Sequence, residues 1–231
     1  MIYVIGDSHG GLFNGYEGLI KHDQIQPQYG YDYKLKNSEF ICLHSKGQNK
    51  FHSFDKNFMS IRTGANTAYN MFSKIDLVDE IVKEYNIDKK KDQILFCYGE
   101  IDTRVHVGAQ EESGKHLTEI ISEITNRYFK FVNRYKDKGY NVIVWGVIPG
   151  GLSGGGAHPN YTSPENRNRV SKLMNESFYK KCNELNIEFI SIWKDLIKID
   201  NYYDYFIDSI HLSYSVCKPL LYLKFKDYIN G

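Results

Sequence analysis

Short apolar runs alternate with longer amphipathic runs along this chain, and this alternation constrains the fold more than any other feature. Near-continuous apolar runs are typical of strands that are covered on both faces of a sheet. Because strands that alternate with helices build parallel βαβ units, the pattern predicts a three-layer α/β domain with a parallel sheet of about five strands. The runs that predict strands are residues 1–6, 39–43, 93–98, 141–145 and 187–192.

The stretches between these runs carry the periodicity of amphipathic helices. The clearest helix is predicted at 113–137, where apolar side chains recur along one face and Gly139 provides a termination signal. The periodicity is poor from 20 to 75. Since there is no internal repeat, long linker or break in composition, we expect residues 1–231 to form a single domain. Further helices are predicted at 76–86, 164–185 and 213–229.

Charge and composition argue against several classes of protein. The chain has 29 basic and 28 acidic side chains, whereas a protein that binds nucleic acid by neutralising phosphates normally has a basic excess. No apolar run approaches the roughly 20 residues that span a bilayer. Residues 1–6 are themselves a predicted strand, and they do not resemble a secretory leader. We therefore expect a cytoplasmic protein without nucleic-acid or membrane partners; the sequence does not predict its oligomeric state.

The cysteines indicate neither a zinc site nor a disulfide framework, because they are far apart and form no CxxC pair. They are Cys42, Cys97, Cys182 and Cys217. Reduced thiols are consistent with an intracellular setting. We expect no metal and no other cofactor.

Polar residues follow three of the predicted strands or precede the last helix. They lie at 6–10 (Gly-Asp-Ser-His-Gly), 99–104 (Gly-Glu-Ile-Asp-Thr-Arg) and 208–213 (Asp-Ser-Ile-His-Leu-Ser). In open α/β sheets the reactive residues lie beyond the carboxyl ends of the strands. We therefore expect the three segments to meet at one edge of the sheet.

Within these segments, Ser8, His211 and Asp208 are a possible nucleophile, base and orienting group. A serine hydroxyl is a poor nucleophile until a neighbouring imidazole can accept its proton. The imidazole needs a carboxylate that sets its tautomer and stabilises the imidazolium. Gly6 and Gly10 leave room for a sharp turn around Ser8. Capping and surface roles for the same residues are the alternative reading.

Two of these segments resemble the SGNH/GDSL hydrolase superfamily: Gly6-Asp7-Ser8 after an N-terminal strand, and Asp208-Ser-Ile-His211 near the C-terminus. Two further segments fall where that family's second and third blocks are expected, namely Gly64 within Arg62-Thr-Gly-Ala-Asn66 and Gly99-Glu-Ile-Asp102. The resemblance implies a three-layer α/β/α sandwich with a flavodoxin-like sheet and a catalytic triad of Ser8, Asp208 and His211.

The resemblance also implies an oxyanion hole that is built partly from the backbone N–H groups of Ser8 and Gly64. The third block usually supplies an asparagine two residues after its glycine, and Ile101 stands at that place. Isoleucine cannot donate a hydrogen bond, so either Arg104 or Thr103 substitutes or the hole is incomplete.

Other residues are candidates for contact with a substrate. We predict this role for Asp7, His9, Asp102 and Arg104, although Arg104 could instead form an ion pair with Glu100 or Asp102. The aromatic run at 202–206 could stack on a sugar ring or simply pack in the core. The glycine-rich loop at 150–156 is a candidate lid or a plain connection, and it is no P-loop because no Lys-Ser/Thr pair follows it.

The favoured hypothesis is a serine esterase that removes a small acyl group, with acetyl as the favoured case, from a carbohydrate or polysaccharide hydroxyl. A Gly-Glu-Ile-Asp block followed by Arg resembles an SGNH branch that is associated with surface-polysaccharide biosynthesis, and this resemblance alone points to a sugar ester. The alternatives are a sugar O-acyltransferase with the same triad and a glycan-binding module that has lost catalysis.

A fourth hypothesis is a metallophosphoesterase, because Gly6-Asp7-Ser8-His9-Gly10 also matches that family's Gly-Asp-x-His-Gly opening. However, the Gly-Asn-His-Glu/Asp segment that completes the two-metal site is absent from this chain. A single Asp-x-His pair cannot hold two metals, so this hypothesis is the least favoured.

Overall fold

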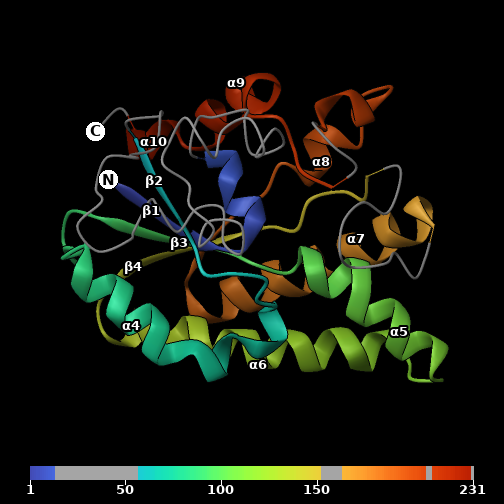
Figure 1. Ribbon diagram of the computed structural model, residues 1–231, viewed down its shortest axis with the longest axis horizontal. Coiled ribbons are helices and arrows are strands. Elements are labelled where there is room, and N and C mark those ends of the chain that lie inside the picture. The colour runs from blue at the N-terminus through green and yellow to red at the C-terminus, as the bar shows by residue number, and fades with distance from the viewer. Residues whose placement is uncertain (14–56, 152–162, 207–209, 230–231) are drawn as a thin grey trace, which may run out of the picture.

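A five-stranded parallel sheet lies between two layers of helices in the part of the chain that the computed structural model describes, residues 1–13, 57–151, 163–206 and 210–229 (Figure 1). The strand order is β2-β1-β3-β4-β5, and each neighbouring pair is parallel. This is the flavodoxin-like order, in which β1 and β3 flank the point where the order reverses. The predicted fold class is confirmed. The strands are β1 (Ile2–Gly6), β2 (Phe58–Arg62), β3 (Gln93–Cys97), β4 (Asn141–Trp145) and β5 (Glu188–Ile190).

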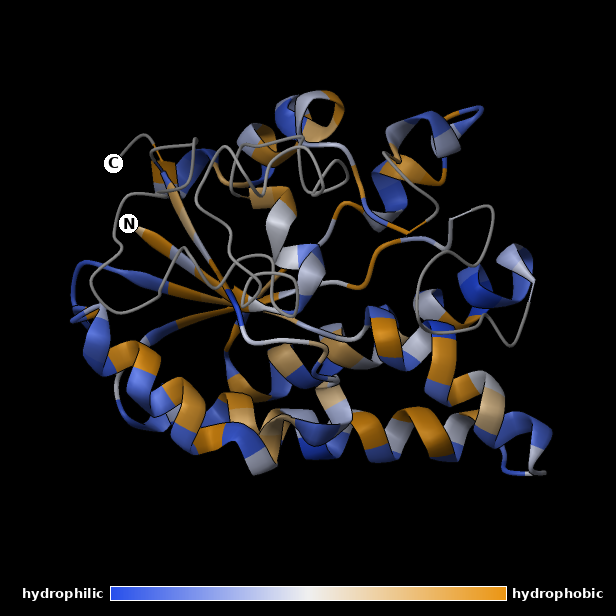
Figure 2. Ribbon diagram, viewed as in Figure 1, coloured by the Kyte–Doolittle hydropathy of each residue, from blue (hydrophilic) through white to orange (hydrophobic). Residues whose placement is uncertain are grey.

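One face of the sheet is covered by three long helices, and these supply most of the larger core cluster. Apolar and polar residues alternate along them, so that each presents an apolar stripe to the sheet (Figure 2). They are α4 (Ile75–Glu84), α6 (Leu117–Asp137) and α7 (Pro164–Leu185), preceded by the short segments η3 (Ala68–Lys74) and α5 (Val107–Glu112).

The opposite face is covered by shorter elements that pack a second core cluster. Successive residues of each strand alternate between the two clusters: in β3, for example, Phe96 joins the first cluster and Leu95 the second. Both faces are therefore buried, which is why these strands read as continuous apolar runs. The elements of this layer are η1 (Ser8–Phe13), α8 (Trp193–Leu196), η5 (Tyr202–Tyr205), α9 (Tyr214–Lys224) and α10 (Lys226–Ile229).

The predicted strands at 1–6, 93–98, 141–145 and 187–192 correspond to β1, β3, β4 and β5. The predicted strand at 39–43 lies outside the described residues. β2 was not predicted from the sequence. It is an edge strand of the described sheet, and its run Phe-Met-Ser-Ile-Arg is interrupted by polar residues. Ser60 is buried in spite of its polar side chain. Its hydroxyl is satisfied there, because it donates to the carbonyl oxygen of Gly10 at 2.6 Å.

The predicted helices are present with altered ends. The helix predicted at 113–137 begins at Leu117, and the run predicted at 213–229 divides into α9 and α10. The prediction at 164–185 matches α7, which begins at Pro164 after the capping residue Ser163. Within the described part of the chain, none of the helices combines the length and apolar character that crossing a bilayer requires. Cys97, Cys182 and Cys217 are buried and form no disulfide.

Gly6 allows β1 and β3 to pack closely at the end where the polar segments emerge. A Cβ atom at this position would lie 2.5 Å from the carbonyl oxygen of Cys97, which is backbone and cannot rotate away. The absence of a side chain here is therefore a requirement of strand packing.

We predict that Gly6→Ala lowers the free energy of unfolding by about 3 kcal/mol, since β1 and β3 must separate to admit the methyl group. The matched control is Gly114→Ala. Gly114 has a φ of +90° and open space around the added Cβ, so only backbone strain of about 1 kcal/mol is expected. Urea unfolding of the two variants measures the difference; equal losses would contradict the packing argument.

Candidate active site

Ser8 lies in the turn that follows β1, at the point of strand-order reversal. The backbone N–H of Asp7 still donates to the carbonyl of Cys97 in β3 at 3.3 Å, and η1 begins at the next residue. The N–H of Gly10 donates back to the carbonyl of Asp7 at 3.2 Å, which closes the turn. The strand therefore changes direction within two residues, and the hydroxyl of Ser8 emerges at the edge of the sheet.

His211 faces Ser8 from the segment that precedes α9. Its Nε2 atom lies 2.8 Å from the Oγ of Ser8, although the two residues are 203 positions apart. The segment is held by an isolated bridge between Phe206 and Leu212 and by the N–H of Ser213, which donates to the carbonyl of Tyr205 at 2.7 Å. This is the geometry in which an imidazole can accept the proton of an attacking hydroxyl.

A small cavity of about 10 Å³ adjoins this pair. The lining residues are Ser8, His9, Leu12, Ile148, His211 and Leu212. The third predicted triad member, Asp208, lies outside the described residues, so its role stays a prediction.

Gly64 follows β2 at the level of Ser8. In the register of β1 and β2, Gly6 pairs with Arg62, so Ser8 and Gly64 each lie two residues beyond the same pair. Thr63 fastens the two strand ends together, because its N–H and its hydroxyl both donate to the carbonyl of Gly6, at 2.8 and 3.0 Å. Gly64 has a φ of +89°, and among the described residues beyond its two chain neighbours none has an atom within 4 Å of the place where a Cβ would be. The placement is compatible with the predicted oxyanion donor.

The third block begins at Gly99 and runs into a π-helical turn, Asp102–His106. Ile101 is buried and brings no donor. The two residues suggested as substitutes are engaged within the turn: the hydroxyl of Thr103 donates to the carbonyl of Glu100 at 2.8 Å, and Nε of Arg104 donates to the Glu100 carboxylate at 2.7 Å. For Arg104, the predicted alternative of an ion pair with Glu100 is thus the arrangement observed.

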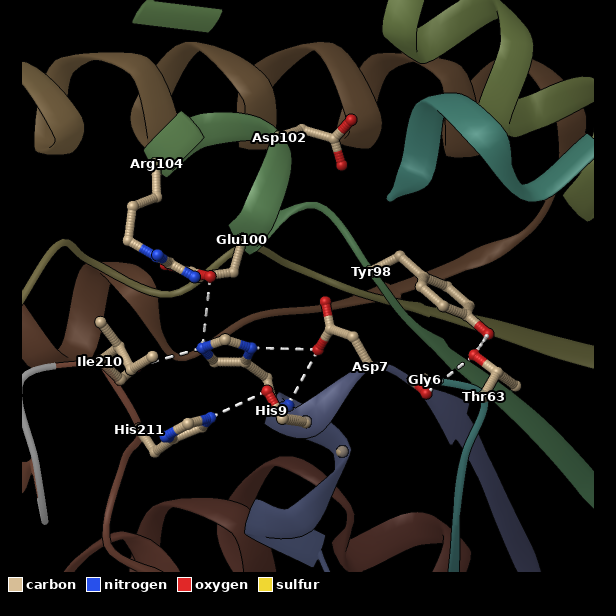
Figure 3. Close-up of polar contacts among 12 residues, drawn as sticks. Gly6, Asp7, His9, Thr63, Tyr98, Glu100, Asp102, Arg104, Ile210 and His211 are labelled. Carbon is tan, nitrogen blue, oxygen red and sulfur yellow. Dashed lines mark hydrogen bonds and ion pairs between the residues drawn. The ribbon is translucent and has the colours of Figure 1, made fainter. Parts of the chain in front are cut away.

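The carboxylate of Asp102 points away from His9 and His211, so Asp102 is not brought to the predicted substrate site (Figure 3). It is fully buried, and its two carboxylate oxygens accept the backbone N–H groups of Ala68 and Tyr69 at 2.7 and 3.2 Å. These residues begin η3, the element after the Gly64 loop. Burial raises the pKa of Asp102 from 3.8 to about 7, although the two N–H groups act in the opposite direction. Asp102 therefore tethers the second block to the third.

Asp7 and His9 form a buried pair that faces Glu100 of the third block (Figure 3). One oxygen of Asp7, Oδ1, accepts the backbone N–H of His9 at 2.8 Å and lies 3.0 Å from Nδ1 of the same residue. Burial alone would lower the pKa of His9, but the carboxylates of Glu100 and Asp7 outweigh it and raise that pKa to about 9. His9 lines the cavity beside Ser8, while both of its ring nitrogens face protein oxygens.

Neither a protein-family model nor a curated protein matches the chain. Solved structures do match over nearly its whole length. A variant of an acetyl-xylooligosaccharide esterase from Geobacillus has a TM-score of 0.54 at 14% identity, covering 98% of this chain and 93% of that one. An acetyl xylan esterase has a TM-score of 0.52 at 14% identity, covering 99% and 100% of the two chains. A G-D-S-L family lipolytic protein from Veillonella parvula has a TM-score of 0.52 at 15% identity, covering 98% and 96%.

The chain has the SGNH/GDSL hydrolase fold. This fold is the one that the Gly6-Asp7-Ser8 and Asp208-Ser-Ile-His211 motifs led us to expect. In this SGNH-type fold the first and last blocks meet at Ser8 and His211, whereas the third block turns inward toward η3 and His9.

Several residues at the site were not found from the sequence. Leu12, Ile148 and Leu212 line the cavity. The only sequence signal for this role was their position near the polar segments that follow the strands or precede α9. Glu100 entered the sequence analysis only as an ion-pair partner, yet its carboxylate lies 3.5 Å from Nε2 of His9. The aromatic run at 202–206 forms η5 and packs partly inward: Tyr202 is buried and donates to the carbonyl of Gly150 at 2.9 Å.

We predict that the stability of the protein responds to pH through Asp102. Because the folded pKa of about 7 exceeds the ordinary value of 3.8, the folded state binds this proton more tightly. The contribution to stability is complete below about pH 4 and is lost as pH rises through 7. Asp102→Asn removes the titration. Urea unfolding at pH 5 and pH 8 should show wild type losing stability relative to this variant at the higher pH, and parallel behaviour would contradict the assignment.

Proposed function

We propose that this protein is a serine esterase of SGNH/GDSL type that removes a small acyl group, acetyl in the simplest case, from a carbohydrate hydroxyl. The observation that carries the proposal is the 2.8 Å contact between Oγ of Ser8 and Nε2 of His211. The fold likeness to esterases supports it. Two of those solved structures are described as acetyl xylan or acetyl-xylooligosaccharide esterases, which supports a sugar ester as the substrate.

In the proposed reaction, Nε2 of His211 accepts the proton of Ser8 as Oγ attacks the carbonyl carbon of the ester. The negative charge on the carbonyl oxygen is stabilised by the backbone N–H groups of Ser8 and Gly64. The bond to the sugar oxygen then breaks, and His211 gives the proton to that oxygen. A water molecule, deprotonated by His211, releases the acyl group as a carboxylic acid and restores the Ser8 hydroxyl.

The metallophosphoesterase alternative finds little support in this arrangement. The two residues of that motif, Asp7 and His9, are hydrogen-bonded to each other, and Nε2 of His9 faces the carbonyl oxygen of Ile210. Among the described residues there is no group of three His, Cys, Asp or Glu side chains that could hold a metal ion.

We predict that Ser8→Ala lowers the kcat/KM for p-nitrophenyl acetate by at least about 10³-fold and abolishes labelling by a fluorophosphonate probe, because the nucleophile is removed. The control is Ser122→Ala, an exposed serine on α6, which should retain wild-type values. Hydrolysis that persists in Ser8→Ala would refute the esterase. Labelling with acyl transfer to an added sugar in place of water would instead identify an acyltransferase, and a wild type that neither labels nor turns over would identify a binding module.

The cavity beside Ser8 predicts a preference for short acyl groups. Leu12 and Ile148 are 5% and 4% exposed and line this cavity with apolar side chains. We expect kcat/KM to be higher for p-nitrophenyl acetate than for the butyrate and octanoate esters. Ile148→Ala should shift this ratio toward butyrate by about 10-fold, the amount that one or two methylenes confer in an apolar pocket. Val78→Ala, a buried valine on α4, controls for lost stability; an equal shift there would contradict the assignment of the acyl site.

A further inference from the structure

His9 lies where three motif segments meet, and each of its ring nitrogens faces an oxygen atom (Figure 3). Nδ1 is 3.0 Å from Oδ1 of Asp7, in its own turn. Nε2 is 3.1 Å from the carbonyl oxygen of Ile210, in the segment before α9. The carboxylate of Glu100, from the third block, approaches the same nitrogen at 3.5 Å. The ring thus joins the first, third and last blocks.

These contacts specify the protonation state of the ring. A backbone carbonyl oxygen can only accept a hydrogen bond, and Oδ1 of Asp7 already accepts the backbone N–H of His9 at 2.8 Å. A neutral imidazole has a single N–H, so one of its two contacts would set acceptor against acceptor. Only the imidazolium satisfies both. The pKa of about 9, raised by Glu100 and Asp7 against the opposing effect of burial, agrees with this geometry.

The ring also contacts the base of the reacting pair. Ile210, whose carbonyl it binds, immediately precedes His211. On the other side of His211, Leu212 is bridged to Phe206, so the backbone is fastened on both sides. The two imidazole rings lie against each other, with centroids 4.8 Å apart and planes inclined by 31°.

We propose that His9, as an imidazolium, is a positioning residue that fixes the backbone and ring of His211 opposite Ser8. This inference rests on the proposed function, in which His211 is the general base. A cation beside the ring of His211 disfavours a second positive charge there. Removal of the His9 charge should therefore change the pH dependence of the proposed reaction.

The charged groups that face His9 come from each element packed against it. Asp7 and Glu100 favour the charged ring, whereas Arg104, which is paired with Glu100, opposes it. His211 faces it from the segment before α9. If the charge on His9 is removed, Asp7 loses its partner cation, whereas Glu100 keeps Arg104, and the ring of His211 no longer lies against an imidazolium.

The first test is the pH dependence of catalysis in His9→Gln. Glutamine keeps an amide N–H that can reach the carbonyl of Ile210 but carries no charge. The acidic limb of the kcat/KM profile for p-nitrophenyl acetate should move to higher pH by on the order of one unit. The matched control is His116→Gln, an exposed histidine, for which the profile should coincide with that of wild type. A limb that stays in place or moves to lower pH in His9→Gln would overturn the proposal.

The second test does not depend on activity. In wild-type protein with ¹⁵N-labelled histidine, nitrogen chemical shifts at pH 7.5 should show one buried ring protonated on both nitrogens, and this signal should be missing from His9→Gln. If that variant does not fold, the wild-type spectrum decides alone: a spectrum with no doubly protonated ring at this pH overturns the proposal. Failure of the esterase hypothesis would appear separately, as hydrolysis that persists in Ser8→Ala.

Discussion

The close contact of β1 with its two neighbouring strands determines where the Ser8 turn and the segments after β2 and β3 leave the sheet. Gly6 pairs with Arg62 on one side and with Cys97 on the other. The blocks that follow β1, β2 and β3 therefore leave the sheet at one level, as parallel strands require. Thr63 reinforces this level, because its hydroxyl also lies 2.8 Å from that of Tyr98 in the segment after β3. The Ser8 turn thus rests on backbone geometry set by strand packing.

Above this level, charges alternate in sign through a largely buried row: Asp7, His9, Glu100 and Arg104. Isolated buried charges are costly, but opposite neighbours with direct hydrogen bonds offset much of the desolvation. The row connects the turn that carries Ser8 to the third block and, through Ile210, to the segment of His211. Ile101 stands where the third block of the resembling family usually has an asparagine. In this chain the third block contacts the site through Glu100, which lies near His9, and holds the start of η3 through Asp102.

Much of the fold was predictable from the sequence because β1, β3 and β4 are covered on both faces and, apart from the first residue of β3 and of β4, consist almost entirely of apolar residues. β2 was missed because it is an edge strand whose Ser60 is satisfied by a hydrogen bond to Gly10, a partner that local sequence does not reveal. The meeting of Ser8 and His211 was predicted from their motifs. The roles of His9 and Asp102 were not, since both read as polar loop residues until distant segments supply their partners.

Cys97 lies directly beneath the turn that carries Ser8, and its environment bears on how the site can be modified. Thiolates are usually better nucleophiles than alcohols. Here, however, burial and the nearby Asp7 raise the pKa of the Cys97 thiol well above its ordinary value, and the side chain is 2% exposed. The Cys97 thiol is therefore expected to be unreactive toward electrophiles. Under the proposed function, an activated ester or phosphonate that enters the cavity would react with the hydroxyl of Ser8, so serine-directed covalent inhibitors should suit this site better than maleimides or iodoacetamides.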